Sequence, residues 1–182
     1  MQDTGIVRRV DELGRVVIPK ELRRTLRIRE GDPLEIYTNK EELILKKYSP
    51  VTSLEEIAKG VCSQLGEITE KSVIITDMDT VVCVSDSKHK EYIGKTISEE
   101  LLKVISGRRS VMGAKGDGGK IYSLFKGDEI NAENQILVPI TAMGDCYGSV
   151  IMFDEDKTNR FSSQDTKLVS LSAGVIAKNF QD

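Results

Sequence analysis

The first fifty residues carry signals for four strands and a helix, which is too short a stretch to bury a core alone. The turn residues 11–14 separate the first two strands, and Asn39-Lys40 separate the last two. The expected elements are strands at 5–10 and 15–19, a helix from Pro19 to near Ile28, and strands at 33–39 and 40–47. A unit of about 48 residues rarely removes enough apolar surface from water. We therefore expect a second copy of the unit to cover its valines, isoleucines and leucines.

The same stretch is strongly basic, although the whole chain has a net charge of −3. Residues 5–29 contain eight basic side chains and three acidic ones. On the expected helix, four basic residues recur at i, i+3, i+4 and i+7, opposite Leu22 and Leu26; they are Lys20, Arg23, Arg24 and Arg27. Like charges at this spacing repel by a few tenths of a kcal/mol per pair. A helix face of one sign therefore indicates a polyanionic ligand rather than ordinary solvation.

The run DELGRVVIPKELRRTL, inside residues 4–50, resembles the DNA-binding segment of the AbrB family of bacterial transition-state regulators. The resemblance implies a swapped-hairpin dimer, in which two chains interleave their strands into one small β-barrel and bind double-stranded DNA. It implies DNA contacts by Arg8, Arg15, Arg23 and Arg24, assisted by Arg9, Lys20 and Arg27. For members with a sensor-like second half, it further implies activation and repression of late sporulation genes.

A second domain is expected over residues 51–182, after a boundary at Tyr48-Ser49-Pro50 that ends domain 1–50. Ser53 and Glu56 have the spacing of a capping box, and an apolar stripe continues from Leu54 to Leu65 before Gly66. Further helices are expected from Thr96 or Ser98 to Gly107 and from Ser163 to Phe180, and strands at 72–76, 81–85, 109–113, 121–125, 135–142 and 148–154. This order predicts an α+β domain with an antiparallel sheet. It is similar to GAF domains, which sense small molecules.

The last expected helix has two apolar stripes, wider than one sheet face requires. The residues are Leu168, Leu171 and Val175, and beside them Val169, Ala173, Ile176 and Phe180. A wide stripe can also meet a partner helix. We expect the second domains to pair as well, which would link N-terminal dimers into a tetramer. Whether this domain also binds an unidentified small molecule or serves only for dimerisation stays open.

Two segments superficially resemble phosphate chemistry. The run Asp77-Met78-Asp79-Thr80 resembles the nucleophile motif of haloacid-dehalogenase-type phosphatases, but a strand follows immediately, so we expect a hairpin turn. GAKGDGGK at 113–120 lacks the Gly-Lys-Ser/Thr order of a P-loop, and we expect a flexible loop that could border a ligand pocket. His89, the only histidine, is expected on the surface. We therefore expect no catalytic residues, no metal site, no cofactor and no enzyme activity.

Three cysteines, an odd number, have no metal-ligand spacing. Cys62 and Cys83 lie in apolar patterns and read as packing residues, whereas Cys146 follows a turn and is expected to be more exposed. No apolar run approaches ~18 residues and no signal-peptide pattern opens the chain. We expect a cytoplasmic protein with reduced thiols and no membrane partner.

An antitoxin-like protein is the alternative function, with the same N-terminal fold and a second half that binds a toxin protein. Toxin-binding tails are generally short and disordered, whereas residues 51–182 are patterned as a folded domain. Protease resistance of the second half distinguishes the two readings.

Overall fold

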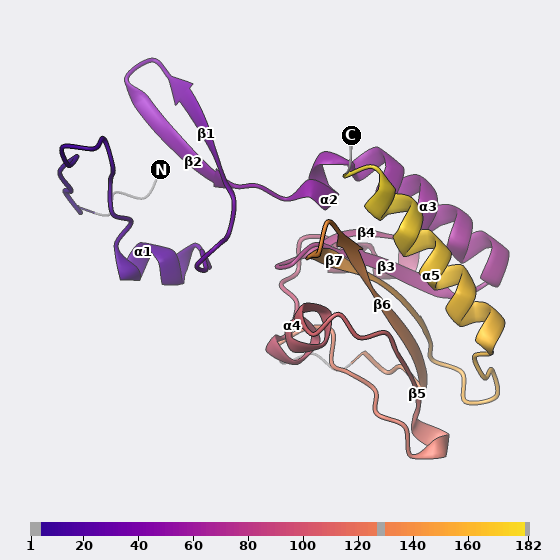
Figure 1. Cartoon of the computed structure of the whole chain (residues 1–182). Helices are drawn as coiled ribbons and strands as arrows, with labels where there is room; N and C mark the ends of the chain where they lie inside the picture. The colour runs from indigo at the N-terminus through magenta and orange to yellow at the C-terminus, as the bar shows by residue number, and fades with distance from the viewer. Residues whose placement is uncertain (1–4, 127–129, 181–182) are drawn as a thin grey trace. The chain divides into compact units, whose positions relative to one another are not determined.

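The computed structural model describes residues 5–126 and 130–180. It divides the chain into two compact units, Met1–Tyr48 and Ser49–Asp182 (Figure 1). The division falls two residues before the domain boundary expected at residue 50.

The first unit contains one short helix and one hairpin. Helix α1 spans Lys20–Thr25, and strands β1 (Leu34–Asn39) and β2 (Glu42–Lys47) pair antiparallel. The hairpin turns at Lys40, whose φ of 52° is left-handed. The helix and the second predicted strand pair are therefore confirmed.

The first predicted strand pair does not form in the single chain. Residues 5–18 contain no strand. They contain one turn, at residues 12–14, which is closed by the hydrogen bond from Asp11 N to Arg15 O. Among residues 5–48 only Pro19 is buried, and Val7 and Val17 are 85% and 73% exposed. A short hairpin with no surface to pack on is marginally stable. The two strands that the sequence predicts in residues 5–18 are therefore not formed in a single copy of the chain.

The second unit is built on a five-stranded sheet of order β4-β3-β7-β6-β5, in which every neighbouring pair is antiparallel (Figure 1). Its strands are β3 (Ser72–Thr76), β4 (Val81–Val84), β5 (Val111–Ala114), β6 (Asn134–Ala142) and β7 (Asp145–Asp154). Its helices are α2 (Pro50–Ser53), α3 (Glu55–Thr69), α4 (Glu99–Ser106) and α5 (Ser163–Lys178), with short 3₁₀ turns η1 (Ser87–Tyr92) and η2 (Lys115–Asp117).

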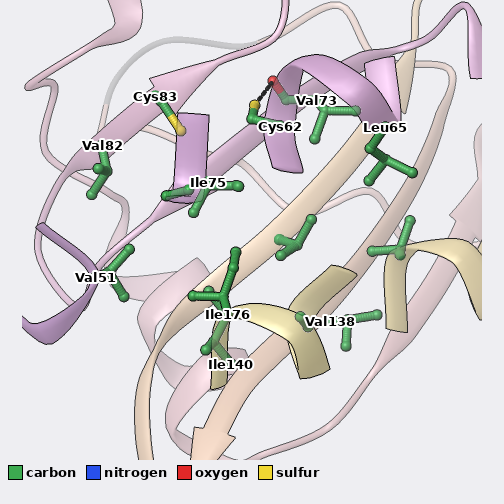
Figure 2. Close-up of a cluster of buried hydrophobic side chains, with 14 of the residues drawn as sticks. Val51, Cys62, Leu65, Val73, Ile75, Val82, Cys83, Val138, Ile140 and Ile176 are labelled. Carbon is green, nitrogen blue, oxygen red and sulfur yellow. Dashed lines mark hydrogen bonds between the residues drawn. The ribbon is translucent and has the colours of Figure 1, made fainter. Parts of the chain in front are cut away.

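Both faces of this sheet are buried, so its central strands are almost continuously apolar. On one face, Val73 and Ile75 of β3 join a cluster under α3 and α5, part of which Figure 2 shows. On the other face, Ile74 joins a second cluster with Leu101 and Ile105 of α4. The sheet is thus a central layer between α3 and α5 on one side and α4 on the other.

Three details differ from the sequence prediction. The predicted capping box at Ser53 is wrong, because Ser49 caps the extra helix α2, and Leu54, whose side chain makes no capping bond, precedes α3. Gly66 does not end α3, which continues to Thr69. Residues 121–125 form only an isolated bridge between Ile97 and Phe125.

One buried side chain explains why residues 121–125 form no strand. The side-chain amide of Gln135 accepts from Tyr122 N at 2.9 Å and donates to Tyr122 O at 3.0 Å. A buried side chain therefore satisfies the backbone groups that a strand ladder would otherwise use.

Candidate nucleic-acid interface

Helix α1 presents basic side chains to solvent. Pro19 precedes its first residue, where a missing N–H has no intrahelical acceptor to lose. Lys20, Arg23 and Arg24 are exposed on the helix, and no residue of α1 is buried. The expected basic face therefore exists, although it is one residue shorter than the pattern predicts.

Arg27 lies beyond the helix rather than on its face. It has a left-handed φ of 54°, and Ile28 N donates to Arg23 O at 2.8 Å, the bond pattern that closes a helix end. Lys47 Nζ donates to Arg27 O at 3.1 Å and lies 3.0 Å from Asp32 Oδ2. The end of α1 is thereby tied to the end of β2.

The three remaining candidates, Arg8, Arg9 and Arg15, lie in the strand-free segment 5–18 and are exposed. Arg15 Nε pairs with Asp11 Oδ2 at 2.8 Å, and Arg15 N donates to Asp11 Oδ1 at 2.8 Å. These two bonds hold the pKa of Asp11 below its ordinary value. The ion pair is solvent-exposed, so a phosphate can compete for the guanidinium at little cost.

Charge divides unevenly between the two units. Residues 1–48 contain eleven Lys and Arg against nine Asp and Glu, whereas residues 49–182 contain fifteen against twenty. A polyanion is therefore attracted to the first unit and repelled by the second.

The second unit exposes apolar side chains along its two long helices. Ile57 and Ile68 of α3 are 37% and 68% exposed, and Leu171 and Val175 of α5 are 65% and 43% exposed. We call these four residues the α3/α5 apolar surface. The inner stripes of the same helices, including Cys62 and Val169, are fully buried against the sheet. Each helix therefore has an apolar side left over after the sheet is covered.

A groove of about 490 Å³ lies between α5 and the second half of β6. Ala173, Gly174 and Ala177 of α5 leave space there, and Arg108 and Thr141 are among its polar lining residues. Its volume is within the range of small-molecule sites. The loop 113–120 contributes no residue to the lining of this groove.

The two phosphate-like segments have structural explanations. Asp77 lies in the turn between β3 and β4, where its Oδ1 accepts from the backbone N–H groups of Asp79 and Thr80 at 2.7 Å. Residues 115–117 form η2, and Gly119 N donates to Ala114 O at 3.0 Å. Both segments thus use their polar groups to turn the chain.

The expectation that His89 lies on the surface is wrong, since its exposed fraction is 2%. Its ring lies 5.1 Å from the rings of Tyr92 and Phe153, and its Nδ1 lies 2.9 Å from Asp86. The polar sequence around it misled the prediction, because η1 turns this one side chain inward among aromatic rings. The sequence does contain one signal for this turn: Asp86, three residues before His89, is a residue type that caps helices, and it caps η1.

The three cysteines are free thiols. Cys62 and Cys83 are buried, as expected for packing residues. Cys146 is partly exposed, and burial raises the pKa of its thiol. A raised pKa lowers the thiolate fraction and therefore disfavours a redox role.

Residues 5–126 and 130–180 contain neither a candidate membrane span nor a candidate metal cluster. No helix there has both the length and the apolar character needed to cross a bilayer. In the same residues, no three His, Cys, Asp or Glu side chains are grouped so that they could hold a metal ion.

An exposed basic helix in a small first unit, followed by a folded sheet domain, fits the class of two-part DNA-binding transcription regulators. The family model "Stage V sporulation protein T C-terminal, transcription factor" matches residues 53–181. Stage V sporulation protein T of Bacillus subtilis (strain 168) is 43% identical over 182 residues, covering 100% of this chain and 99% of that protein. The chain belongs to the stage V sporulation protein T family.

Each unit also has relatives of its own. The transition state regulatory protein AbrB of B. subtilis is 53% identical over 73 residues, which are 40% of this chain and 68% of that protein. The model "Antidote-toxin recognition MazE, bacterial antitoxin" matches residues 7–53. The GAF-B domain of DevS from Mycobacterium smegmatis aligns with a TM-score of 0.54 at 12% identity, over 73% of this chain and 93% of that one. The first unit is therefore AbrB-like and the second has a GAF fold, and membership in a transcription-factor family indicates a regulator rather than an enzyme.

Proposed function

We propose that this regulator binds double-stranded DNA through Arg8, Arg9, Arg15, Lys20, Arg23, Arg24 and Arg27, displayed in duplicate by a dimer of the first unit. The observation that carries the proposal is the set of exposed, like-charged side chains on and beside α1. Arginine forks suit both phosphate oxygens and guanine edges. The helix offers no Asn or Gln for adenine, so selectivity comes largely from DNA shape and bending.

The dimer follows from the lack of a core in the first unit. Only Pro19 is buried among residues 5–48, while apolar side chains such as Leu43 (64% exposed) face solvent. In a swapped-hairpin dimer, residues 5–18 of each copy gain strand partners. Pairing would satisfy the backbone groups of this segment and cover its valines in one step.

A second contact, through the α3/α5 apolar surface, would join two such dimers into a tetramer. The α3/α5 apolar surface places four large apolar side chains on two adjacent helices. Packed against the same surface of a second copy, these helices would form a four-helix bundle. The occupant is a second copy of the chain, because an isologous contact buries the same surface twice.

Family membership supports control of sporulation genes. The proposal extends to genes expressed late in spore formation, with activation at some promoters and repression at others. An unidentified small molecule in the second unit would make this control responsive, and the groove beside α5 offers space for one. Mass spectrometry of molecules that co-purify with the full chain tests this part.

The antitoxin alternative is favoured by one observation, the match of residues 7–53 to an antitoxin model. Against it, residues 49–182 form a compact unit with two buried clusters, unlike a disordered toxin-binding tail. A protease-resistant C-terminal fragment supports the regulator, and rapid loss of that half supports the antitoxin.

Salt dependence tests DNA binding directly. If a dimer neutralises about six to ten phosphates, affinity falls by roughly 10³ to 10⁵ between 50 and 200 mM salt. Fluorescence anisotropy with a labelled duplex measures this slope. An affinity that stays flat across the range contradicts the proposal.

A further inference from the structure

Ser49, the first residue of the second unit, uses all the hydrogen-bonding capacity of its hydroxyl group. Its Oγ accepts from Thr52 N at 3.2 Å and from Thr52 Oγ1 at 2.9 Å, which caps α2. Its own proton goes to Asp77 Oδ2, 2.9 Å away. One donor and two acceptor positions are the full inventory of a hydroxyl. Ser49 therefore joins α2 to a carboxylate that lies 28 residues away in sequence.

Asp77 connects this contact to the sheet. Its other oxygen, Oδ1, holds the β3–β4 turn through the N–H groups of Asp79 and Thr80. The same turn is bonded to the chain that leads into α4, because Ile97 N donates to Asp79 O at 2.9 Å. A displacement on the α4 side of the sheet would therefore act on the Asp77 carboxylate and on Ser49.

Helix α2 has a second anchor in Val51. This side chain is fully buried in the cluster beneath α3 and α5, and Figure 2 shows it there on the side of Val82. With only four residues, α2 cannot be stable as an isolated helix. We expect it to be folded only while Val51 and Ser49 are docked, and we call the folded and unfolded forms of α2 docked and released.

The first unit is anchored up to the residue before Ser49. Tyr48 N donates to Pro33 O at 3.0 Å, and Lys47 Nζ is bonded to Arg27 O and Asp32. With α2 docked, no unanchored residue separates Tyr48 from Ser49. With α2 released, residues 49–54 become a free tether, which at about 3.5 Å per residue can span roughly 20 Å.

We propose that Ser49 and Asp77 are positioning residues for DNA binding, forming a clamp that keeps the tether of the basic unit short. The clamp rests on the DNA-binding function proposed above. In an assembly with several basic units, a short tether raises the effective concentration of one unit once another has bound, and a longer tether dilutes it. The docked and released states of α2 thereby become high- and low-affinity states of the whole regulator.

Substitutions at these two positions separate the clamp from capping of α2. Ser49→Asp keeps an acceptor that caps a helix, but it lacks the donor and places a carboxylate against Asp77. Adding Asp77→Asn restores a donor to the pair and removes the repulsion. Ser49→Thr is the matched control, because it keeps both the donor and the acceptors.

Two measurements on the full-length protein are needed. Hydrogen exchange of the amides of residues 52–54 reports docking of α2, because all three are hydrogen-bonded in the docked helix. Anisotropy on a duplex with two binding sites reports affinity. We expect Ser49→Asp to speed exchange and to weaken DNA binding, each on the order of tenfold. Ser49→Thr and the double variant Ser49→Asp with Asp77→Asn return both readings toward wild type.

Exchange in Ser49→Asp equal to that of wild type overturns the clamp. Faster exchange with unchanged DNA affinity overturns the positioning role. If the wild-type protein does not bind DNA, the proposed DNA-binding function is overturned. If the wild type binds DNA and Ser49→Asp matches it in both exchange and affinity, only the clamp is overturned.

Discussion

Asp86 and His89 form a closed pair at the start of η1, where both carboxylate oxygens of Asp86 lie 2.9 Å from His89 Nδ1. Asp86 Oδ1 also accepts from His89 N at 3.0 Å. On the other side of the ring, the buried Nε2 lies 3.9 Å from Glu155 Oε1. The pair holds η1 against the end of β7 and explains how a single histidine can be buried.

This pair predicts a pH-dependent contribution to stability. Desolvation opposes the charged form of Asp86, but hydrogen bonds from His89 outweigh it and leave the pKa of Asp86 below its ordinary value. A carboxylate whose pKa is lowered in the folded state stabilises the fold at pH values above its unfolded-state pKa of ~4. This stabilisation is lost as the pH falls through the folded-state pKa. Asp86→Asn should therefore lower the free energy of unfolding by about 1–2 kcal/mol at pH 7, and by less at pH 3. Urea unfolding at both pH values measures the difference; the exposed Asp145→Asn is the control, and an equal loss at both contradicts the assignment.

Arg23→Ala with Arg24→Ala is expected to abolish DNA binding while the oligomeric state stays that of wild type. Both side chains are exposed on α1, so their removal takes charge from the proposed interface without opening a core. Anisotropy measures binding and sedimentation measures assembly. Lys46→Ala removes a basic residue of β2 outside the interface and should bind DNA as wild type does. Wild-type affinity in the double variant would show that α1 does not contact DNA.

Two glycines of α3 should respond oppositely to the same substitution. A Cβ at Gly66 would lie 2.5 Å from the Cβ of Ser85, the residue that follows β4, whereas a Cβ at Gly60 meets no atom within 4 Å. Gly60→Ala should stabilise by about 0.5–1 kcal/mol through helix propensity. Gly66→Ala should destabilise by about 1–3 kcal/mol, because α3 must move off the sheet. Thermal unfolding of both variants tests this, and stabilisation by both would mean that α3 is not held close to β4.

The α3/α5 apolar surface predicts a specific loss of assembly. Ile68→Glu with Leu171→Glu places charges on two residues that are 68% and 65% exposed, so the single unit should remain folded. The proposed tetramer should dissociate to the proposed dimers of the first unit, because burying unpaired carboxylates at the contact is costly. Sedimentation velocity measures the change. Ile93→Glu, at an exposed apolar residue that follows η1, is the control and should keep the oligomeric state of wild type.

Local patterns in the chain predicted most elements of the second unit. Continuous apolar runs located β3, β6 and β7, and Ser98 and Gly107 bounded α4 where the pattern placed its cap and its end. The basic residues of α1 and the hairpin of β1 and β2 were also readable, because helix periodicity and a turn are properties of neighbouring residues.

The order of helices and strands, the charge of the first unit and its inability to bury a core can therefore be predicted from the sequence. Tertiary structure alone decided that residues 5–18 lack strands in a single copy, that His89 is buried, that Gly66 faces Ser85 and that Asp77 bonds Ser49. The difference lies in how far apart in the sequence the interacting residues are. Helix periodicity, caps and turns act over a few residues, whereas burial, close approach and strand pairing depend on segments brought together only by the folded chain or by a second copy.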